Sequence, residues 1–125
     1  MLNSNSPNPI YVQIAEWIET EILNGHFDED EKVYSQYQLA EMYTINPATA
    51  AKGLNLLFHE KILYKKRGLG MFVSAGAKER IIAKRKNQTF DRLVKELVLE
   101  AAQLQINEQT LIQILREEMK RGSER

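Results

Sequence analysis

The chain contains no cysteine among its 125 residues. Disulfide bonds, cysteine-ligated zinc sites and thiol nucleophiles are therefore excluded. No stretch approaches the roughly 20 apolar residues of a membrane-spanning helix, and residues 1–7 have neither the basic nor the apolar region of a signal peptide. We therefore expect a cytoplasmic protein that does not bind membranes.

Signals of catalysis are also missing. The sequence has no nucleophile paired with a base and no glycine-rich phosphate loop at a strand-to-helix turn. His26 and His59 have no further ligands at a spacing that would bind a metal ion. The sequence predicts neither an enzyme nor a site for a metal or cofactor.

Net charge is absent too, since 17 basic and 17 acidic side chains balance. The two signs are nevertheless separated along the chain. Residues 16–31 hold seven acids and no lysine or arginine, whereas residues 61–86 hold nine lysines and arginines and one acid. Such a separation can present a positive face to phosphates on a neutral molecule. By itself it fits a solvated helix face equally well.

What the chain does contain is a periodic apolar pattern between turn signals. Residues 1–8 indicate a flexible polar arm. Isoleucines recur every four positions over residues 10–22, which predicts an amphipathic helix that ends at Gly25. Residues 26–34 are polar and acidic and predict a loop.

Two capped helices are expected after this loop. Ser35 begins a capping-box pattern at the start of a short helix. Asn46 is a strong N-cap residue and Pro47 suits a first helical position, so a second helix is expected from there to about Lys61. The tight connection between them is typical of a helix-turn-helix. The buried stripe of the second helix is expected at Ala50, Leu54, Leu57 and Phe58.

The apolar period then changes from that of a helix to that of strands. Residues 62–73 hold two β-prone runs around a glycine-containing tip, which predicts a hairpin. Bases lie near this tip. Two helices followed by a basic hairpin form a winged helix-turn-helix, expected over residues 9–75.

The remaining residues, 76–125, predict two helices, one from about Lys78 to Leu104 and one capped by Asn107. The fold class is thus mainly α with a small β-hairpin. The apolar face of these helices packs either on the winged module or on a second subunit. A symmetric dimer is the economical solution, and it sets two recognition helices about 34 Å apart for a palindromic operator. Dimer contacts are expected at Phe90, Leu93, Val94, Leu97, Val98, Ala101, Leu104, Leu111 and Leu115.

Four motifs, in order, resemble the GntR family of regulators and its YtrA-type branch. They lie at residues 9–14 with 22–25, at Ser35 with Leu39 and Ala40, at residues 46–52 and at residues 67–73. Each motif alone is weak, but four at the family's spacing are specific. The resemblance implies a winged helix-turn-helix repressor whose two C-terminal helices replace a large effector domain.

The chain departs from this family at several positions. Tyr34, Gln36 and Tyr37 stand where proline, glutamate and arginine are usual, and that arginine commonly contacts DNA. Met71 replaces a common threonine of the wing. Lys61 stands where glycine often follows the recognition helix, and a non-glycine residue held at positive φ costs about 1 kcal/mol.

Small residues on the exposed face of the helix expected from Pro47 to about Lys61 favour close approach to double-stranded DNA. We expect Thr49 and Lys52 to contact bases or phosphates, whereas Asn46 is a helix cap first. The basic side chains of residues 65–67 are suited to contacts with phosphates. The glycines at the tip let the wing approach the DNA closely. The expected DNA-binding residues are Ser35, Tyr37, Asn46, Ala48, Thr49, Lys52, Lys65, Lys66, Arg67, Gly68 and Gly70.

Two functions are compatible with these patterns. The first is a homodimeric repressor that binds a palindromic operator. The alternative is a winged-helix module that binds protein and not DNA; the zero net charge, Tyr37 and the sparse recognition helix favour it. A small-molecule effector, if there is one, must act through the C-terminal helices or their junction with the wing near residues 74–80.

Overall fold

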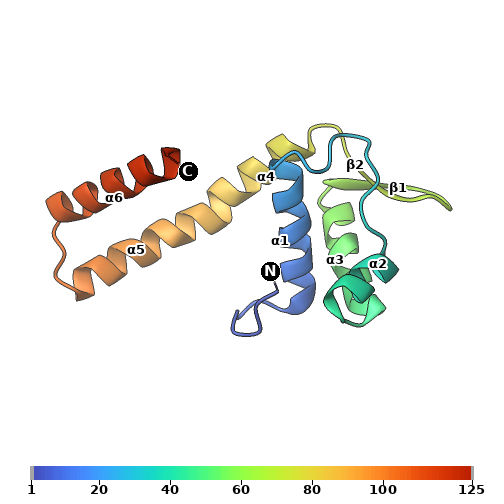
Figure 1. The fold of residues 1–125 in the computed structure, drawn as a ribbon, viewed down its shortest axis with the longest axis horizontal. Helices are drawn as coiled ribbons and strands as arrows, with labels where there is room; N and C mark the ends of the chain where they lie inside the picture. The colour runs from blue at the N-terminus through green and yellow to red at the C-terminus, as the bar shows by residue number, and fades with distance from the viewer. Residues whose placement is uncertain (1, 125) are drawn as a thin grey trace. The chain divides into compact units, whose positions relative to one another are not determined.

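The computed structural model describes residues 2–124, so the ends of the expected arm and of the expected C-terminal region, Met1 and Arg125, lie outside the described residues. The chain divides into two compact units, unit 1 up to Ala83 and unit 2 from Lys84 onward (Figure 1). The elements are α1 (Ile10–Leu23), α2 (Gln36–Tyr43), α3 (Pro47–His59), β1 (Leu63–Lys66), β2 (Gly70–Val73), α4 (Ala77–Arg85), the π-helical turn η1 (Lys86–Phe90), α5 (Asp91–Gln103) and α6 (Glu108–Ser123). The predicted fold class, mainly α with a small hairpin, is confirmed.

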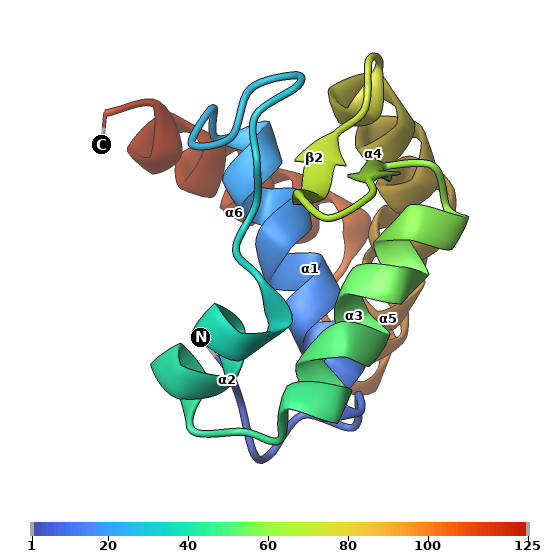
Figure 2. The same ribbon diagram turned by 90° about the vertical axis from the view of Figure 1, so that its right-hand side faces the viewer.

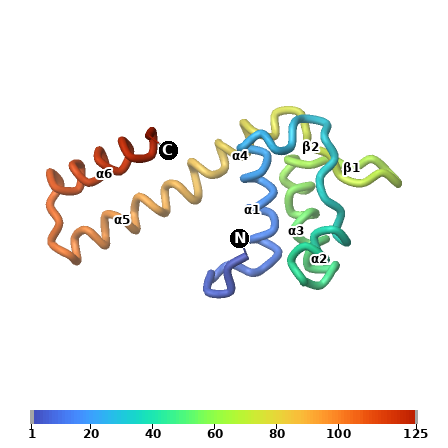
Figure 3. The backbone as a smooth tube through the Cα atoms, viewed as in Figure 1, coloured from blue at the N-terminus to red at the C-terminus, as the bar shows by residue number. Residues whose placement is uncertain are grey.

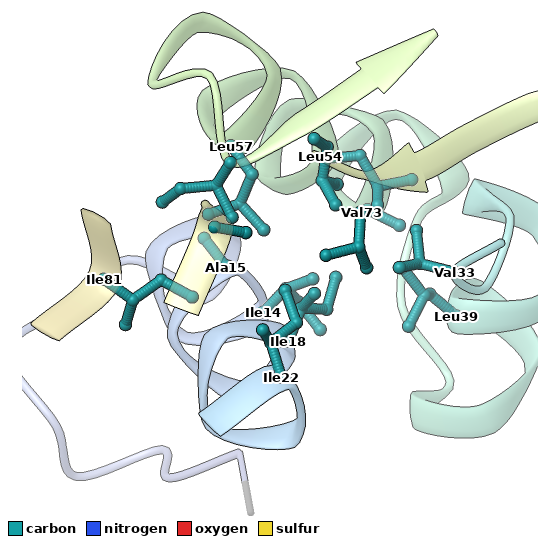
Figure 4. Close-up of a cluster of buried hydrophobic side chains, with 14 residues drawn as sticks. Ile14, Ala15, Ile18, Ile22, Val33, Leu39, Leu54, Leu57, Val73 and Ile81 are labelled. Atoms are coloured by element: carbon teal, nitrogen blue, oxygen red, sulfur yellow. The ribbon is translucent and has the colours of Figure 1, made fainter. Parts of the chain in front are cut away.

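The core of unit 1 forms where α1 and α2 pack against α3 (Figure 2). The isoleucine repeat of α1 faces inward, and Ile14, Ile18 and Ile22 are buried. Burying an aliphatic side chain of this size contributes about 1.5–3 kcal/mol. Figure 4 shows them meeting side chains from α3, β2 and α4. The labelled core residues are Ile14, Ala15, Ile18, Ile22, Val33, Leu39, Leu54, Leu57, Val73 and Ile81.

The helices α1 and α3 come into close contact at Gly53. A Cβ atom there would lie 2.8 Å from the backbone oxygen of Tyr11 and 3.0 Å from Cγ2 of Ile14. Real Cβ atoms do not come so close to a backbone oxygen, so a glycine is required for this contact. Gly53 is thus part of the buried stripe of α3, together with the predicted Ala50, Leu54 and Leu57, whereas the predicted Phe58 is half-buried.

The predicted helix caps are confirmed. Ser35 Oγ accepts a hydrogen bond from the Gln38 backbone N–H, and Gln38 Oε1 accepts one from the Ser35 N–H. Asn46 Oδ1 accepts from the Ala48 N–H, with Pro47 in the first turn of α3. A cap of this kind stabilises a helix by about 1 kcal/mol.

The recognition helix is shorter than expected and ends at His59 instead of near Lys61. Lys61 has φ of +62°, which confirms that a non-glycine residue holds the left-handed conformation after this helix. Its backbone oxygen accepts a hydrogen bond from Arg80 Nη1, 2.7 Å away in α4. The tight exit from α3 is therefore tied to the helix that follows the wing.

The wing is an antiparallel hairpin with Leu63 opposite Val73 and Lys66 opposite Gly70. The segment that the sequence predicts as a plain loop pairs with it. The Asp30 N–H donates to the Val73 carbonyl, and the Val73 N–H donates to the Glu31 carbonyl. Lys32 forms an isolated bridge with Phe72, so the acidic segment lies along β2 like a short third strand.

The segment expected to be an arm contacts α1. The side chain of Gln13 accepts a hydrogen bond from the Asn3 N–H and donates to the carbonyl oxygens of Asn3 and Asn8. Leu2 packs against the core of unit 1. These contacts place residues 2–8 beside the start of α1.

The single helix expected from about Lys78 to Leu104 is divided into α4, η1 and α5. A π-helical turn such as η1 accommodates an extra residue within a helix. Asn107 caps α6 as predicted, because its Oδ1 accepts from the Thr110 N–H. Figure 3 follows the chain from α5 into α6. In the turn between these two helices, Gln105 has φ of +59°. None of the helices within residues 2–124 has the length and apolar character that crossing a membrane requires.

Candidate nucleic-acid interface

The start of α2 and the wing enclose a surface pocket of about 290 Å³ in unit 1. Its walls join the capped end of α2 to both strands and the tip of the hairpin. The structure thereby brings together residues that are 30 positions apart in the sequence. The expected DNA-binding residues in its lining are Ser35, Tyr37, Lys65, Lys66, Arg67, Gly68 and Gly70.

The other four expected DNA-binding residues belong to the first half of α3. Asn46, Ala48 and Lys52 are exposed, and Thr49 is half-buried. The side-chain oxygen of Asn46 serves the helix cap, which leaves its amide N–H groups as donors for a phosphate. The small side chain of Ala48 leaves room for a base pair to approach this part of the helix closely.

The three lysines of the site each lie over an aromatic ring of the protein. Lys52 Nζ is 4.1 Å from the ring centroid of Tyr11, and Lys65 Nζ is 4.6 Å from that of Phe58. Lys66 Nζ lies 4.4 Å from the Phe72 centroid. A ring attracts a cation through its quadrupole and leaves the positive charge intact. Within residues 2–124 none of these lysines forms an ion pair, so the full charge of each remains available.

Arg67 and Tyr37 extend into solvent at the rim of the pocket. Arg67 is exposed and has no hydrogen-bond or ion-pair partner in the described part of the chain. Tyr37 is 69% exposed, at the position where the family commonly has an arginine. Its phenol can donate one hydrogen bond to a phosphate but adds no charge.

The acidic segment beside the wing is engaged with other groups. Asp30 Oδ1 accepts a hydrogen bond of 2.7 Å from the Tyr64 hydroxyl, and Glu29 Oε1 accepts one of 2.8 Å from the Gly76 N–H. The bond to Asp30 raises the pKa of the Tyr64 hydroxyl, because it favours the neutral phenol. Asp30 and Glu29 thus bond to groups other than the wing lysines, although this acidic segment pairs with β2.

Both wing glycines have positive φ, +78° at Gly68 and +113° at Gly70. Open space surrounds Gly68, whereas a Cβ at Gly70 would lie 3.0 Å from Cε of Lys32. The aliphatic part of Lys32 therefore crosses the hairpin at Gly70. This contact adds a cation to the wing that the sequence did not indicate.

Sequence reasoning also missed Gly53 and Tyr11. Nothing local marks Gly53, because a glycine inside a helical pattern reads as a small loss of helix propensity. Tyr11 lies in the opening motif, but no pattern in the sequence links it to a lysine 41 positions later. The repeat of isoleucines in α1 and the apolar stripe of α3 were the available signals that these two helices pack together.

The expected dimer residues are mostly exposed within the chain. Leu111 is half-buried and Ala101 is buried. A contiguous apolar helix face left in water is typical of an interaction surface. The exposed members of the expected set are Phe90, Leu93, Val94, Leu97, Val98, Leu104 and Leu115.

Residues 2–124 hold no group of three or more histidine, aspartate or glutamate side chains arranged to bind a metal ion. The candidate interface itself presents cations, hydroxyls, amides and backbone N–H groups. Such groups bind anions and base edges.

Comparison with known proteins agrees with this geometry. No family model matches the chain. The HTH-type transcriptional repressor NagR of Bacillus subtilis is 40% identical over 73 residues, which is 58% of this chain and 30% of that protein. The HTH-type transcriptional repressor YtrA of the same organism is 29% identical over 100 residues, 80% of this chain and 76% of that protein. The chain thus spans less than a third of NagR but most of YtrA.

Solved structures extend the likeness to both units. A GntR-family transcriptional regulator from Bacteroides thetaiotaomicron is 30% identical with a TM-score of 0.72, over 91% of this chain and 99% of that one. The DNA-binding domain of AraR, in complex with its operator ORR3, is 28% identical with a TM-score of 0.53, over 59% of this chain and 89% of that one. The chain belongs to the GntR family of transcriptional regulators, as its four motifs predicted.

Proposed function

We propose that this chain is a sequence-specific DNA-binding transcription regulator without catalytic activity, which works in the cytoplasm as a homodimeric repressor on a palindromic operator. The observation that carries the proposal is the set of unneutralised cations on two elements of unit 1, Lys52 on α3 and residues 65–67 on the wing. Four positive charges with no ion-pair partner among the described residues suit a polyanion.

In this proposal α3 enters a major groove with its N-terminal half leading. Thr49 and Lys52 reach base edges or the adjoining phosphates, since a lysine can donate to guanine O6 and N7 and a threonine can touch a thymine methyl. Asn46 and Ser35 lie at helix N-termini, where backbone N–H groups favour phosphate oxygens. AraR, whose DNA-binding domain is similar, binds its operator in the solved complex.

The wing lies along the flanking backbone. Lys65, Lys66 and Arg67 contact phosphates, which adds affinity but little sequence information. Gly68 and Gly70 keep the tip free of side chains, so that the hairpin can approach the minor groove closely. The tyrosine at position 37 replaces a charged contact with a neutral one.

Dimerisation supplies the second half of the operator contact. The apolar residues of α5 and α6 are exposed within one chain, and a second copy presents the same residues to cover them. Two subunits double the number of phosphate contacts, which compensates for the few base contacts of each α3. A small-molecule effector, if the regulator takes one, would act on α5 and α6 or on residues 74–80.

Fluorescence polarisation tests the proposal with a labelled duplex from upstream of the gene and a shuffled duplex of equal composition. We expect operator binding at least about 10³-fold tighter than shuffled binding at physiological salt. The logarithm of the binding constant should fall linearly with the logarithm of salt concentration.

Lys52→Ala should weaken operator binding by about 1–3 kcal/mol if the lysine reads a base, and by less if it contacts a phosphate. Lys95→Ala is the matched control, because Lys95 pairs with Asp91 on α5 and lies outside the site. If the wild type is a folded dimer and binds the operator and shuffled duplexes with equal affinity, the proposed regulator is rejected and the protein-binding module is favoured.

A further inference from the structure

We propose that Tyr11 of α1 is a positioning residue for Lys52, which it holds over its ring in the orientation that α3 presents to DNA. The inference rests on the proposed function, because it assigns a role within the same DNA-binding site. Tyr11 itself touches no DNA in this arrangement. It acts on recognition only through the lysine.

The geometry of the pair is specific. The ammonium of Lys52 lies 4.1 Å from the centroid of the Tyr11 ring, well within the roughly 6 Å over which a cation and an aromatic face attract. Lys52 is exposed and Tyr11 is half-buried. Within residues 2–124 Lys52 has no hydrogen-bond or ion-pair partner, so the ring is the one polar attraction that orients it.

The ring is fixed relative to the recognition helix although it belongs to a different helix. Gly53, next to Lys52 in the chain, brings the backbone of α3 against that of α1 at Tyr11 itself. Because the missing Cβ permits this contact, the backbones that carry Tyr11 and Lys52 stay close together as long as the two helices remain packed. The backbone that carries the Tyr11 ring is thus held against α3.

A ring suits this role better than a carboxylate would. An aspartate or glutamate at position 11 would also hold the lysine, but it would cancel the charge that a phosphate or guanine must meet. The face of a ring restrains the long side chain while the ammonium keeps its charge and its donors. Restraint before binding lowers the entropy that the flexible lysine loses when it docks.

The same arrangement recurs at the other two lysines of the site. Lys65 lies over Phe58, and Lys66 lies over Phe72, at 4.6 and 4.4 Å. Phe58 comes from α3 and Phe72 from β2, so the three rings belong to three different elements. A recurring pairing of DNA-facing lysines with rings, and of none with an acid, indicates a common means of ordering charge without neutralising it.

A double-mutant cycle tests the inference with the full chain and the operator duplex. Tyr11→Leu should weaken operator binding roughly two- to five-fold, which is the range of an exposed cation–π pair. Tyr11→Phe keeps the ring and should bind like the wild type. In the Lys52→Ala background, Tyr11→Leu should cause no further loss, because the lysine through which it acts is gone.

Equal losses from Tyr11→Leu in both backgrounds would overturn the inference and assign Tyr11 a purely structural role. If the wild type prefers the operator while the cycle is additive, the inference alone fails. If the wild type shows no preference for the operator over the shuffled duplex, the proposed function fails and takes the inference with it.

A second measurement needs no DNA, and its main observation is made on the wild type. In the free wild type, the ε-methylene protons of Lys52 should be shifted upfield by the Tyr11 ring current relative to those of the solvated Lys95. Tyr11→Phe should retain the shift and Tyr11→Leu should abolish it. An unshifted Lys52 signal in the wild type would overturn the inference by itself.

Discussion

Unit 1 and unit 2 use apolar side chains in opposite ways. In unit 1 the apolar stripes of α1 and α3 meet, and Ile14, Ile18 and Leu57 are fully buried. In the described part of unit 2 the buried residue is Ala101, and the leucines and valines of α5 and α6 are exposed, apart from the half-buried Leu111. One unit therefore holds a core of its own, whereas the other leaves exposed the apolar side chains that we propose a second copy covers.

The largest expected effect comes from removing a core side chain of unit 1. Ile18→Ala should lower the free energy of unfolding by about 2–5 kcal/mol, because it leaves a cavity where the side chain is 0% exposed. Urea denaturation followed by circular dichroism measures it. Ile114→Ala in α6, where the side chain is 45% exposed, is the matched control and should cost far less. Equal costs would erase the contrast between the units.

A charge introduced on the exposed face of unit 2 should have the next largest effect, and it should change the oligomeric state. Val94→Glu places a carboxylate within the surface that we propose a second copy covers, and burying it there costs about 2 kcal/mol or more. Analytical ultracentrifugation should show monomers at concentrations where the wild type is dimeric. The thermal unfolding of unit 1 should not change. A variant that stays dimeric would place the interface elsewhere.

Adding one methyl group at a glycine should have opposite signs in the two units. Gly53→Ala should destabilise the chain by about 1–3 kcal/mol, because the new Cβ meets the Tyr11 carbonyl oxygen. Gly122→Ala adds a Cβ in open space within α6 and should stabilise it by up to about 1 kcal/mol. Chemical denaturation of both variants checks the signs. Two stabilising substitutions would show that α1 and α3 are less tightly packed than their contact at Gly53 indicates.

The smallest expected effect concerns the exit from α3. Lys61→Gly should stabilise unit 1 by up to about 1 kcal/mol, because glycine adopts φ of +62° without steric cost. The hydrogen bond from Arg80 to the carbonyl of residue 61 does not depend on the side chain and is retained. Glu60→Gly, at φ of −81°, is the control and should destabilise. A loss of stability in Lys61→Gly would contradict the strain.

Local signals were enough to predict much of the fold. The caps at Ser35, Asn46 and Asn107 depend on side chains that bond to their own neighbours, so the sequence displays them directly. The left-handed backbone conformation of Lys61 could be predicted because the family often has a glycine at this position. The hairpin could be predicted from a change of period around two glycines.

Features that depend on distant segments could not be predicted in this way. The pairing of Lys32 with Phe72 joins residues 40 positions apart, and the acidic composition of that segment favours a loop. The π-helical turn at residues 86–90 leaves the helical apolar pattern readable on both sides and so gives no break signal. The Tyr11–Lys52 pair requires the crossing of α1 and α3, which periodicity alone does not fix.

The contact at Gly53 also determines which partner adjusts when protein and operator meet. With a glycine packed against α1 there, the recognition helix cannot move closer to α1. Part of the fit is then expected to come from the duplex, through its groove width and its capacity to bend. We therefore expect operators to be ranked partly by the stiffness of base steps that no side chain reaches.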